Sequence, residues 1–289
     1  MKTKIIINPI SGTQKHKNIN EIFEKYLKDY EIVYTEYQNH AFEISKKLDD
    51  EFDRVIVAGG DGTVNECVRG LIDKDITLAT LPSGSGNGFS LHNNIDTNLE
   101  KAIKSLANYK EIKSDVWTIN DNPFINVSGT GFDALIANSF SKLKNRGFNS
   151  YIKLVLKNVI AYKPQKYSIE IDNEKINTEA FFIAFANASE YGNGAVISPK
   201  SKINDGLLDI VIVKKFNKLL IPKLIYYIFK KRIHKFKKVI IKQGKMIRIT
   251  CKSKESFLVH LDGEPKKISG ALEIKISKRK LKVLINEKD

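Results

Sequence analysis

The chain has 289 residues, 42% of them hydrophobic, so it can bury a core and its composition is not that of a disordered protein. This length suits one large domain or two modest ones. With 48 Lys and Arg against 33 Asp and Glu, the formal net charge is +15, which is compatible with nucleic acid, an anionic membrane surface or a phosphate-rich ligand as partner. No apolar run approaches the roughly 20 residues needed to span a bilayer.

Short apolar runs alternate with segments of helical spacing in the first half of the chain. They predict strands at residues 4–8, 31–37, 54–58 and 76–81 and helices at residues 18–30, 41–52, 64–72 and 98–107. Repeated strand–helix–strand units with short loops are typical of a parallel sheet with helices on its faces. We therefore expect residues 1–119 to form an α/β domain.

The second half is predicted to be mostly antiparallel β-structure. Strands are expected at residues 116–120, 124–128, 167–171, 180–186, 208–213, 239–242, 246–251, 257–261 and 272–276. Helical stretches interrupt them at about residues 132–162 and 219–231. Many strands without intervening helices are typical of a sandwich, so we expect residues 120–276 to form an antiparallel β-sandwich domain.

The positive charge is concentrated in residues 214–254, which hold 15 Lys and Arg and no Asp or Glu. Within this segment, residues 216–232 mix bulky apolar side chains with lysines, and their apolar arc is wide for a helix with one buried side. We interpret this stretch as a helix that rests on an anionic membrane surface. The alternative is a helix packed on the sandwich. Cys67 and Cys251 lie far apart without motif spacing, which favours a reducing cytoplasm.

Two glycine-rich loops follow consecutive predicted strands. The first is Gly59-Gly60-Asp61-Gly62-Thr63, placed where backbone amides and a helix N-terminus can bind a phosphate. Asp61 beside phosphates would require a divalent cation between them. The alternative is a tight turn in which Asp61 caps the next helix. The second loop is Gly84-Ser85-Gly86-Asn87-Gly88, and two such loops at neighbouring strand ends favour the phosphate interpretation.

Three motifs, in this order and at these spacings, resemble the diacylglycerol kinase catalytic family: Asn8-Pro9-Ile10-Ser11-Gly12, Gly59-Gly60-Asp61-Gly62-Thr63-Val64-Asn65-Glu66 and Leu81-Pro82-Ser83-Gly84-Ser85-Gly86-Asn87. The resemblance extends through Gly131-Phe132-Asp133-Ala134, Asp205-Gly206-Leu207-Leu208-Asp209 and Asp262-Gly263-Glu264. It implies an α/β domain like that of NAD kinases and phosphofructokinases, which binds ATP, and a lipid that binds beside the β-sandwich. It also implies that a last strand within residues 277–289 returns to the first domain.

The resemblance assigns nucleotide contacts residue by residue. The loop residues that it implies are Asn8, Ser11, Gly12, Gly59, Gly60, Gly62, Thr63, Gly84 and Ser85. Lys15 would reach the phosphates from the first loop, and Arg146 would reach them from the sandwich side. Glu66 would hold the ribose or adenine side of the nucleotide.

Asp262 is the candidate general base. A carboxylate within hydrogen-bond reach of the lipid hydroxyl can orient it and accept its proton, while the rest of the site positions reactants and neutralises charge. Glu264 would share a strand face with Asp262 if the segment stays extended. With Asp61, these acids could order a catalytic Mg²⁺. The alternative for Asp262-Gly263-Glu264 is a plain β-turn, because Asp-Gly is a strong turn signal.

A further acidic segment resembles one that binds a structural divalent ion in bacterial members of the family. Its ligands would be the Lys202 carbonyl, the Asp205 side chain and the Leu207 carbonyl, an oxygen-only set that suits Mg²⁺ or Ca²⁺. The alternative is a simple turn that enters the next strand.

The acceptor lipid stays open. The sequence Gly84-Ser85-Gly86-Asn87 resembles sphingoid-base kinases and some bacterial lipid kinases, whereas many bacterial diacylglycerol kinases differ there. Asn87 and Asp133 are the candidate substrate-binding residues, and Asp133 aligns with a region that senses the lipid amine in sphingoid kinases. The resemblance implies ATP-dependent phosphorylation of a hydroxyl of diacylglycerol or a related membrane lipid, with a sphingoid-base kinase as the alternative.

Other classes of function fit less of the sequence. A NAD kinase would share Gly59–Thr63, but the downstream Gly-x-x-Gly-Phe-Leu element is missing. Asp61, Asp262 and Glu264 argue against a sensor without catalysis, and a nucleic-acid role explains the charge but none of the motifs. His92 and His260 lack the spacing of a nucleophile or metal site, so we interpret both as structural. We expect a cytoplasmic enzyme, peripheral on the inner membrane face, and the family's dimers leave a homodimer open.

Overall fold

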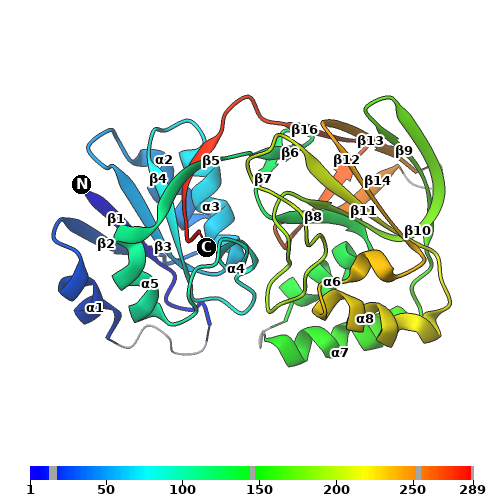
Figure 1. Ribbon diagram of the computed structural model, residues 1–289, viewed down its shortest axis with the longest axis horizontal. Coiled ribbons are helices and arrows are strands. Elements are labelled where there is room, and N and C mark those ends of the chain that lie inside the picture. Colours follow the sequence, from blue (N-terminus) through cyan, green and yellow to red (C-terminus); the bar gives the residue numbers. More distant parts are fainter. Residues whose placement is uncertain (13–17, 144–146, 252–254, 288–289) are drawn as a thin grey trace. The chain divides into compact units, whose positions relative to one another are not determined.

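The computed structural model describes residues 1–12, 18–143, 147–251 and 255–287 (Figure 1). The chain divides into two compact units: unit 1 is Met1–Asp115 with Lys278–Asp289, and unit 2 is Val116–Ser277. Unit 1 has a largely parallel sheet with helices, and unit 2 has antiparallel strands. The predicted fold class is therefore confirmed.

The sheet of unit 1 has the strand order β2-β1-β3-β4-β17-β5. Its strands are β1 Thr3–Ile7, β2 Tyr30–Tyr34, β3 Arg54–Gly59, β4 Thr77–Pro82, β5 Lys110–Ser114 and β17 Leu281–Ile285. Neighbouring strands run parallel except β5, which is antiparallel to β17. β3 and β4 are buried along their whole length, as expected for strands of a parallel sheet covered on both faces.

Helices cover both faces of this sheet (Figure 1). They are α1 Ile19–Tyr26, α2 His40–Lys47, α3 Asp61–Leu71, α4 Gly88–His92 and α5 Leu99–Ser105, followed by the 3₁₀ turn η1 Leu106–Asn108. On one face, Ile5 and Ile56 pack in a cluster with Phe23 of α1 and Ile103 of α5. Side chains alternate along a strand, so Ile6 points to the other face, and it is also fully buried. Figure 1 shows α2 and α3 on that face.

Among the elements of unit 1 that differ from the prediction are α1, α3 and β5. α1 ends at Tyr26 because Tyr30 already pairs with Thr3 of β1. α3 begins at Asp61, three residues earlier than expected, so the second half of the first glycine motif is helical. Strand β5 was not predicted, because its sequence Lys-Glu-Ile-Lys-Ser is mostly charged and polar, as is common for an exposed edge strand.

The strands of unit 2 pair in the order β15-β14-β8-β10-β9-β13-β16-β6-β7, and β11 joins β10 to β12. They are β6 Trp117–Ile119, β7 Asn122–Phe124, β8 Val127–Gly131, β9 Gln165–Ile171, β10 Glu174–Ala186, β11 Leu208–Lys214, β12 Val239–Gly244, β13 Met246–Thr250, β14 Ser256–Leu261, β15 Glu264–Ser269 and β16 Leu272–Ile276. β15 was not predicted, since most of its side chains are polar and exposed.

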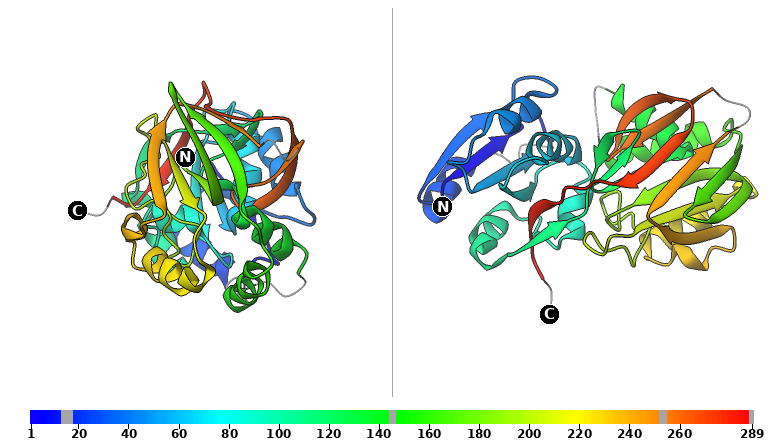
Figure 2. Two further views of the ribbon diagram at one scale, coloured as in Figure 1. Left: turned by 90° about the vertical axis from the view of Figure 1, so that its right-hand side faces the viewer. Right: turned by 90° about the horizontal axis from the view of Figure 1, so that it is seen from above.

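Alternation along β10 separates two cores in unit 2. Ile183 and Phe185 pack inside the sheet with Trp117, whereas Phe182 and Ala184 face the helices. The helical elements are α6 Phe132–Ser141, α7 Phe148–Val159, α8 Ile221–Phe229, η2 Lys218–Leu220 and η3 Ile233–Lys235. α7 and α8 (green and yellow) lie on one side of the sheet in Figure 1 and in the left view of Figure 2. In the described part of the chain, no helix is both long and apolar enough to cross a membrane.

Candidate functional site

The first candidate site lies at the end of β3 and the start of α3 in unit 1. Gly60 precedes the helix, and Val64 N donates the first helical hydrogen bond to its carbonyl at 3.0 Å. The amides of Asp61, Gly62 and Thr63 therefore occupy the first turn, where a helix offers donors that its own carbonyls do not use. This is the local geometry that binds phosphate in many proteins.

The second glycine loop touches the first through its backbone. A Cβ on Gly84 would lie 2.4 Å from the Gly60 Cα, so this approach requires glycine. Asn87 closes the loop, because its Oδ1 accepts from Gly84 N at 2.7 Å and its Nδ2 donates to the Gly84 carbonyl at 2.9 Å. Its side chain thus supports the loop from a buried position, and its role in substrate binding stays a prediction. Ser85 is exposed at the tip of the loop.

The first motif of the chain meets both loops. Asn8 Nδ2 donates to Thr63 Oγ1 at 2.9 Å, and Ser11 Oγ donates to the Asn8 carbonyl at 2.9 Å. Gly12 has a φ of 69°, and a Cβ there would lie 2.1 Å from the Ser83 carbonyl oxygen. The structure therefore brings the predicted nucleotide contacts of the three motifs together in unit 1. Lys15 and Arg146, also predicted, fall outside the described residues.

Two acidic side chains of α3 hold backbone amides. Asp61 Oδ1 accepts from Phe89 N at 3.4 Å and so ties the start of α3 to α4. Glu66 accepts from Asn39 N at 2.9 Å and from Ala41 N at 3.2 Å, where α2 begins. Glu66 therefore serves the N-terminus of α2, and its contact with a nucleotide stays a prediction.

The second candidate site is the turn between β14 and β15 in unit 2. Asp262 and Gly263 both have positive φ, 48° and 93°, as in a tight two-residue hairpin. Asp262 is 5% exposed, and its two carboxylate oxygens accept from Ile125 N at 3.0 Å and Asn126 N at 2.9 Å. These amides fix the orientation of the carboxylate.

The turn corrects the expectation for Glu264. Leu261 pairs with Glu264 across the hairpin, so Asp262 and Glu264 do not share a face of one extended strand. The cause is the Asp-Gly sequence, which adopts the left-handed conformations that this turn requires. Glu264 is exposed, while Asp262 is buried.

A buried polar cluster lies beside this turn. Asp133, in the first turn of α6, accepts at Oδ2 from Tyr191 OH at 3.2 Å and lies 3.2 Å from His260 Nε2. The opposite ring nitrogen, Nδ1 of His260, accepts from Gly263 N at 3.2 Å. Burial and the nearby Asp133 carboxylate raise the pKa of Tyr191 well above its usual range, so its hydroxyl remains a donor. Sequence analysis selected Asp133, treated His260 as structural and gave no signal for Tyr191.

Gly129 of β8 makes room for this cluster. A Cβ there would lie 2.2 Å from Asp133 Oδ2 and 2.8 Å from the Ile183 carbonyl. The carboxylate therefore packs directly on the strand backbone, in a position that only glycine permits.

The predicted structural-metal segment forms a turn before β11. Asp205 is exposed, and its Oδ1 accepts from Leu207 N at 3.0 Å, while the next acid, Asp209, is buried and accepts from Ser201 Oγ at 2.7 Å. Ligation by the Lys202 carbonyl, Asp205 and the Leu207 carbonyl stays a prediction. Among the described residues, no group of three His, Cys, Asp or Glu is placed to hold a metal ion.

Two further titratable groups in unit 1 are made inert by burial. Burial lowers the pKa of His92 to about 4, so this ring is neutral at neutral pH. Burial also raises the pKa of Cys67 to about 12, so its thiolate is scarce. Neither group is suited to nucleophilic or acid–base chemistry at pH 7.

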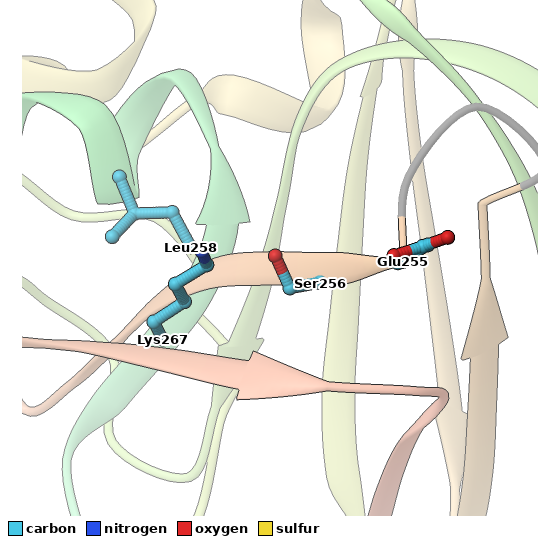
Figure 3. A pocket seen from close by; sticks show the side chains of 4 residues that line it. All are labelled: Glu255, Ser256, Leu258 and Lys267. Carbon is cyan, nitrogen blue, oxygen red and sulfur yellow. The ribbon is translucent and has the colours of Figure 1, made fainter.

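A surface hollow of about 330 Å³ lies on β14 and β15, lined by Glu255, Ser256, Leu258 and Lys267 (Figure 3). It contains none of the residues that the motifs select. Its lining combines an acid, a base, a hydroxyl and one aliphatic side chain without convergent donors, so we do not assign it a function.

Comparisons with known proteins agree with the motifs. Residues 2–119 match the family model described as the diacylglycerol kinase catalytic domain. Residues 126–285 match the YegS C-terminal NAD kinase beta sandwich-like domain. Together these two matches account for nearly the whole chain.

Individual relatives point the same way. A diacylglycerol kinase of Bacillus subtilis is 30% identical over 233 residues, which is 75% of each protein. A YegS-like protein of Shewanella frigidimarina, described as a probable lipid kinase, is 30% identical over 186 residues, and the match spans 60% of that relative's length. A crystal structure from Bacillus anthracis, described as a candidate diacylglycerol kinase, has a TM-score of 0.79 and 27% identity, with 99% of this chain and 97% of that chain covered.

Proposed function

Because this chain belongs to the diacylglycerol kinase catalytic family, we propose that it transfers the γ-phosphate of ATP to a hydroxyl of diacylglycerol or a related membrane lipid. The observation that carries the proposal is the Asp262 carboxylate, buried and oriented by two backbone amides. A carboxylate held in this way can receive a hydroxyl proton in a defined direction.

ATP binding is assigned to unit 1. The first turn of α3, the Gly84 loop and the Asn8–Gly12 motif converge there, and their contacts leave no room for side chains at Gly12 and Gly84. Backbone amides held this close can surround phosphate oxygens without a cationic side chain.

Transfer would break the bond between the γ-phosphorus and the β–γ bridging oxygen and form one to the lipid hydroxyl oxygen. ADP carries away the bridging oxygen, and the hydroxyl proton passes to Asp262 late in the reaction. A Mg²⁺ ion would supply charge neutralisation of the phosphates. Asp61 fits such an ion, since it lies in the first turn of α3, and Mg²⁺ in kinases is typically held by one or two carboxylates with phosphate oxygens and water.

Asp133 is the residue that we assign to the acceptor lipid. Its Oδ1 accepts only the amide of the adjacent Ala134 within the described structure, at 2.7 Å, which leaves acceptor capacity for a hydroxyl or an ammonium group. This capacity favours a second candidate, a sphingoid-base kinase, because an amine would neutralise a largely buried carboxylate.

An anionic membrane surface, on the cytoplasmic side, is the proposed location of the reaction. α8 packs on unit 2 through Ile221 and Leu224 but leaves other apolar side chains exposed. In α8, Tyr226 is 55% exposed. Next to it, η2 exposes Leu219 at 84% and Leu220 at 41%, and α7 with the residue that follows it exposes Leu156 at 55% and Ile160 at 78%. Lys218 Nζ donates to the Ile160 carbonyl, so the end of α7 and η2 are neighbours. Apolar side chains among lysines suit insertion at anionic headgroups.

Incubation with labelled ATP, Mg²⁺ and vesicles of diacylglycerol or sphingoid base in anionic phospholipid tests the proposal. We expect a phosphorylated lipid, with kcat lowered about 10²- to 10⁴-fold in Asp262→Asn. In this variant the side-chain NH₂ group would face the donating backbone N–H of Ile125 or Asn126, so one hydrogen bond is lost. Unfolding is therefore measured together with activity. Full activity in a folded Asp262→Asn variant would remove the residue from the base role. Product from sphingoid base alone would select the second candidate.

The membrane part is tested separately by vesicle sedimentation across a salt series. We expect Leu219→Ser and Lys223→Gln to weaken binding to anionic vesicles, and the wild type to dissociate as salt rises. Binding that is indifferent to anionic lipid and to salt would contradict the electrostatic contribution.

A further inference from the structure

His260 has two neighbours that matter for the reaction, one on each ring nitrogen. Its Nδ1 accepts from Gly263 N at 3.2 Å, within the turn that carries Asp262. A backbone N–H can only donate, so Nδ1 is an acceptor and the ring proton resides on Nε2. Nε2 therefore donates to Asp133 Oδ2, 3.2 Å away.

The ring itself has little freedom. His260 is 2% exposed, and it lies where β14 pairs with Gly129 of β8. Tyr191 donates to the same Asp133 oxygen, and its ring centroid is 5.9 Å from that of His260. The same Asp133 oxygen occupies the space of a Gly129 side chain, 2.2 Å from the position of a Cβ. A fixed imidazole thus joins two carboxylate-bearing segments, α6 and the β14–β15 turn.

We propose that His260 is a positioning residue that links the acceptor-lipid carboxylate, Asp133, to the turn that orients the base, Asp262. It acts through Gly263 N–H on one side and through Asp133 Oδ2 on the other. Tyr191 donates a second hydrogen bond to Asp133. The inference rests on the proposed kinase function for its kinetic consequences, but its hydrogen bonds can be tested without activity.

Two amide substitutions separate the two bonds. In His260→Asn the side-chain oxygen can take the place of Nδ1 as the acceptor for Gly263, while the donor to Asp133 is lost. In His260→Gln the longer side chain can place an N–H donor near the position of Nε2, while the acceptor for Gly263 is lost. Tyr191→Phe removes the second donor to Asp133 and leaves the turn unchanged.

We expect opposite kinetic signatures from the pair. His260→Gln should lower kcat by about 10-fold or more, since small misplacement of a catalytic group is costly, with the KM for lipid near that of the wild type. His260→Asn and Tyr191→Phe should raise the KM for lipid about 3- to 10-fold, as expected for one lost hydrogen bond to a charged group, with kcat less affected. The KM for ATP should stay unchanged in all three variants.

Amide hydrogen exchange supplies the readout that does not need activity. The amide of Gly263 should exchange faster in His260→Gln than in the wild type or in His260→Asn. A merely structural histidine would instead lower the melting temperature in both variants, with equal kcat and KM in the folded protein, and that result would overturn the proposal. If the wild type phosphorylates no lipid, the kinase function fails, and equal Gly263 exchange in both His260 variants would independently refute the linkage.

Discussion

The candidate site of unit 1 is built from backbone contacts, whereas that of unit 2 is built from hydrogen bonds of side chains. In unit 1 the close contacts are between backbones, with glycine required at Gly12 and Gly84 because another loop occupies the space of a side chain. In unit 2 the contacts are hydrogen bonds of buried side chains, above all Asp262 and Asp133. The first site should therefore be most sensitive to added atoms, and the second to removed polar atoms.

The largest effect should follow from one methyl group in unit 1. Gly12→Ala would place a Cβ 2.1 Å from the Ser83 carbonyl oxygen, in a backbone conformation with φ of 69°. We expect destabilisation of about 3 kcal/mol or more, from overpacking added to left-handed strain, and loss of ATP binding. Urea unfolding and calorimetric titration with ATP measure the two consequences.

Gly270→Ala is the matched control. Gly270 has a similar φ of 78°, but a Cβ there meets nothing within 4 Å. It should cost only the strain of the left-handed region, about 1–2 kcal/mol, and leave ATP binding intact. Equal losses in the two variants would mean that the contact with Ser83 contributes nothing and that the contrast between the units is wrong.

Acid should weaken unit 1 through His92. The pKa of His92 is about 4 in the folded chain against its ordinary 6.5, so between these values the unfolded chain binds the proton and the folded chain does not. The free energy of unfolding therefore keeps its full value above pH 6.5. It falls by about 3 kcal/mol in all as the pH falls toward 4.

Hydrogen exchange of unit 1 peptides at pH 7 and pH 5, corrected for intrinsic rates, measures this loss. His92→Gln should flatten the pH dependence, while replacement of the exposed His234 by Gln should leave it as it is. A pH dependence that survives His92→Gln would assign the effect to other groups.

One glycine in unit 2 breaks the simple contrast. A Cβ on Gly129 would meet the Asp133 carboxylate at 2.2 Å, so here a glycine makes room for a side chain. Gly129→Ala should displace Asp133 and cost about 2 kcal/mol, less than Gly12→Ala because the nearest atom is a carboxylate oxygen that can move, while the nearest backbone atom, the Ile183 carbonyl oxygen, lies 2.8 Å away. The KM for lipid should rise while ATP binding stays constant. Unchanged lipid kinetics would argue against Asp133 as the acceptor residue.

Periodicity sufficed to predict the fold where strands are buried and apolar, as in β3 and β4. It failed at β5 and β15, because their polar sequences are set by pairing and exposure rather than by alternation. The start of α3 was placed late, since Gly62 has a low helix propensity but lies in the first turn, where that propensity matters little.

Site residues could be predicted from the sequence where they belong to a motif, as Asp262 does. They were harder to predict where their role depends on tertiary contacts. Glu264 was expected to share a strand face with Asp262 if the segment stayed extended, but the left-handed turn separates a buried acid from an exposed one. Tyr191 gave no sequence signal and His260 was interpreted as structural, because their importance depends on meeting Asp133, 58 and 127 residues away along the chain.

Glu66 gives the smallest effect and the sharpest test of the contrast, because it is a carboxylate in unit 1 that holds two backbone amides, as Asp262 does in unit 2. It is only partly buried, so water can replace it at Asn39 and Ala41. Glu66→Ala should therefore cost about 1 kcal/mol, the usual value for a lost helix N-terminal acceptor.

Glu21→Ala, at an exposed position in the first turn of α1, is the control and should change stability by less. If Glu66→Ala lowers stability and leaves the KM for ATP unchanged, its carboxylate serves α2 alone. A rise in that KM larger than the stability loss explains would return Glu66 to the nucleotide site and show that unit 1 also depends on a polar side chain.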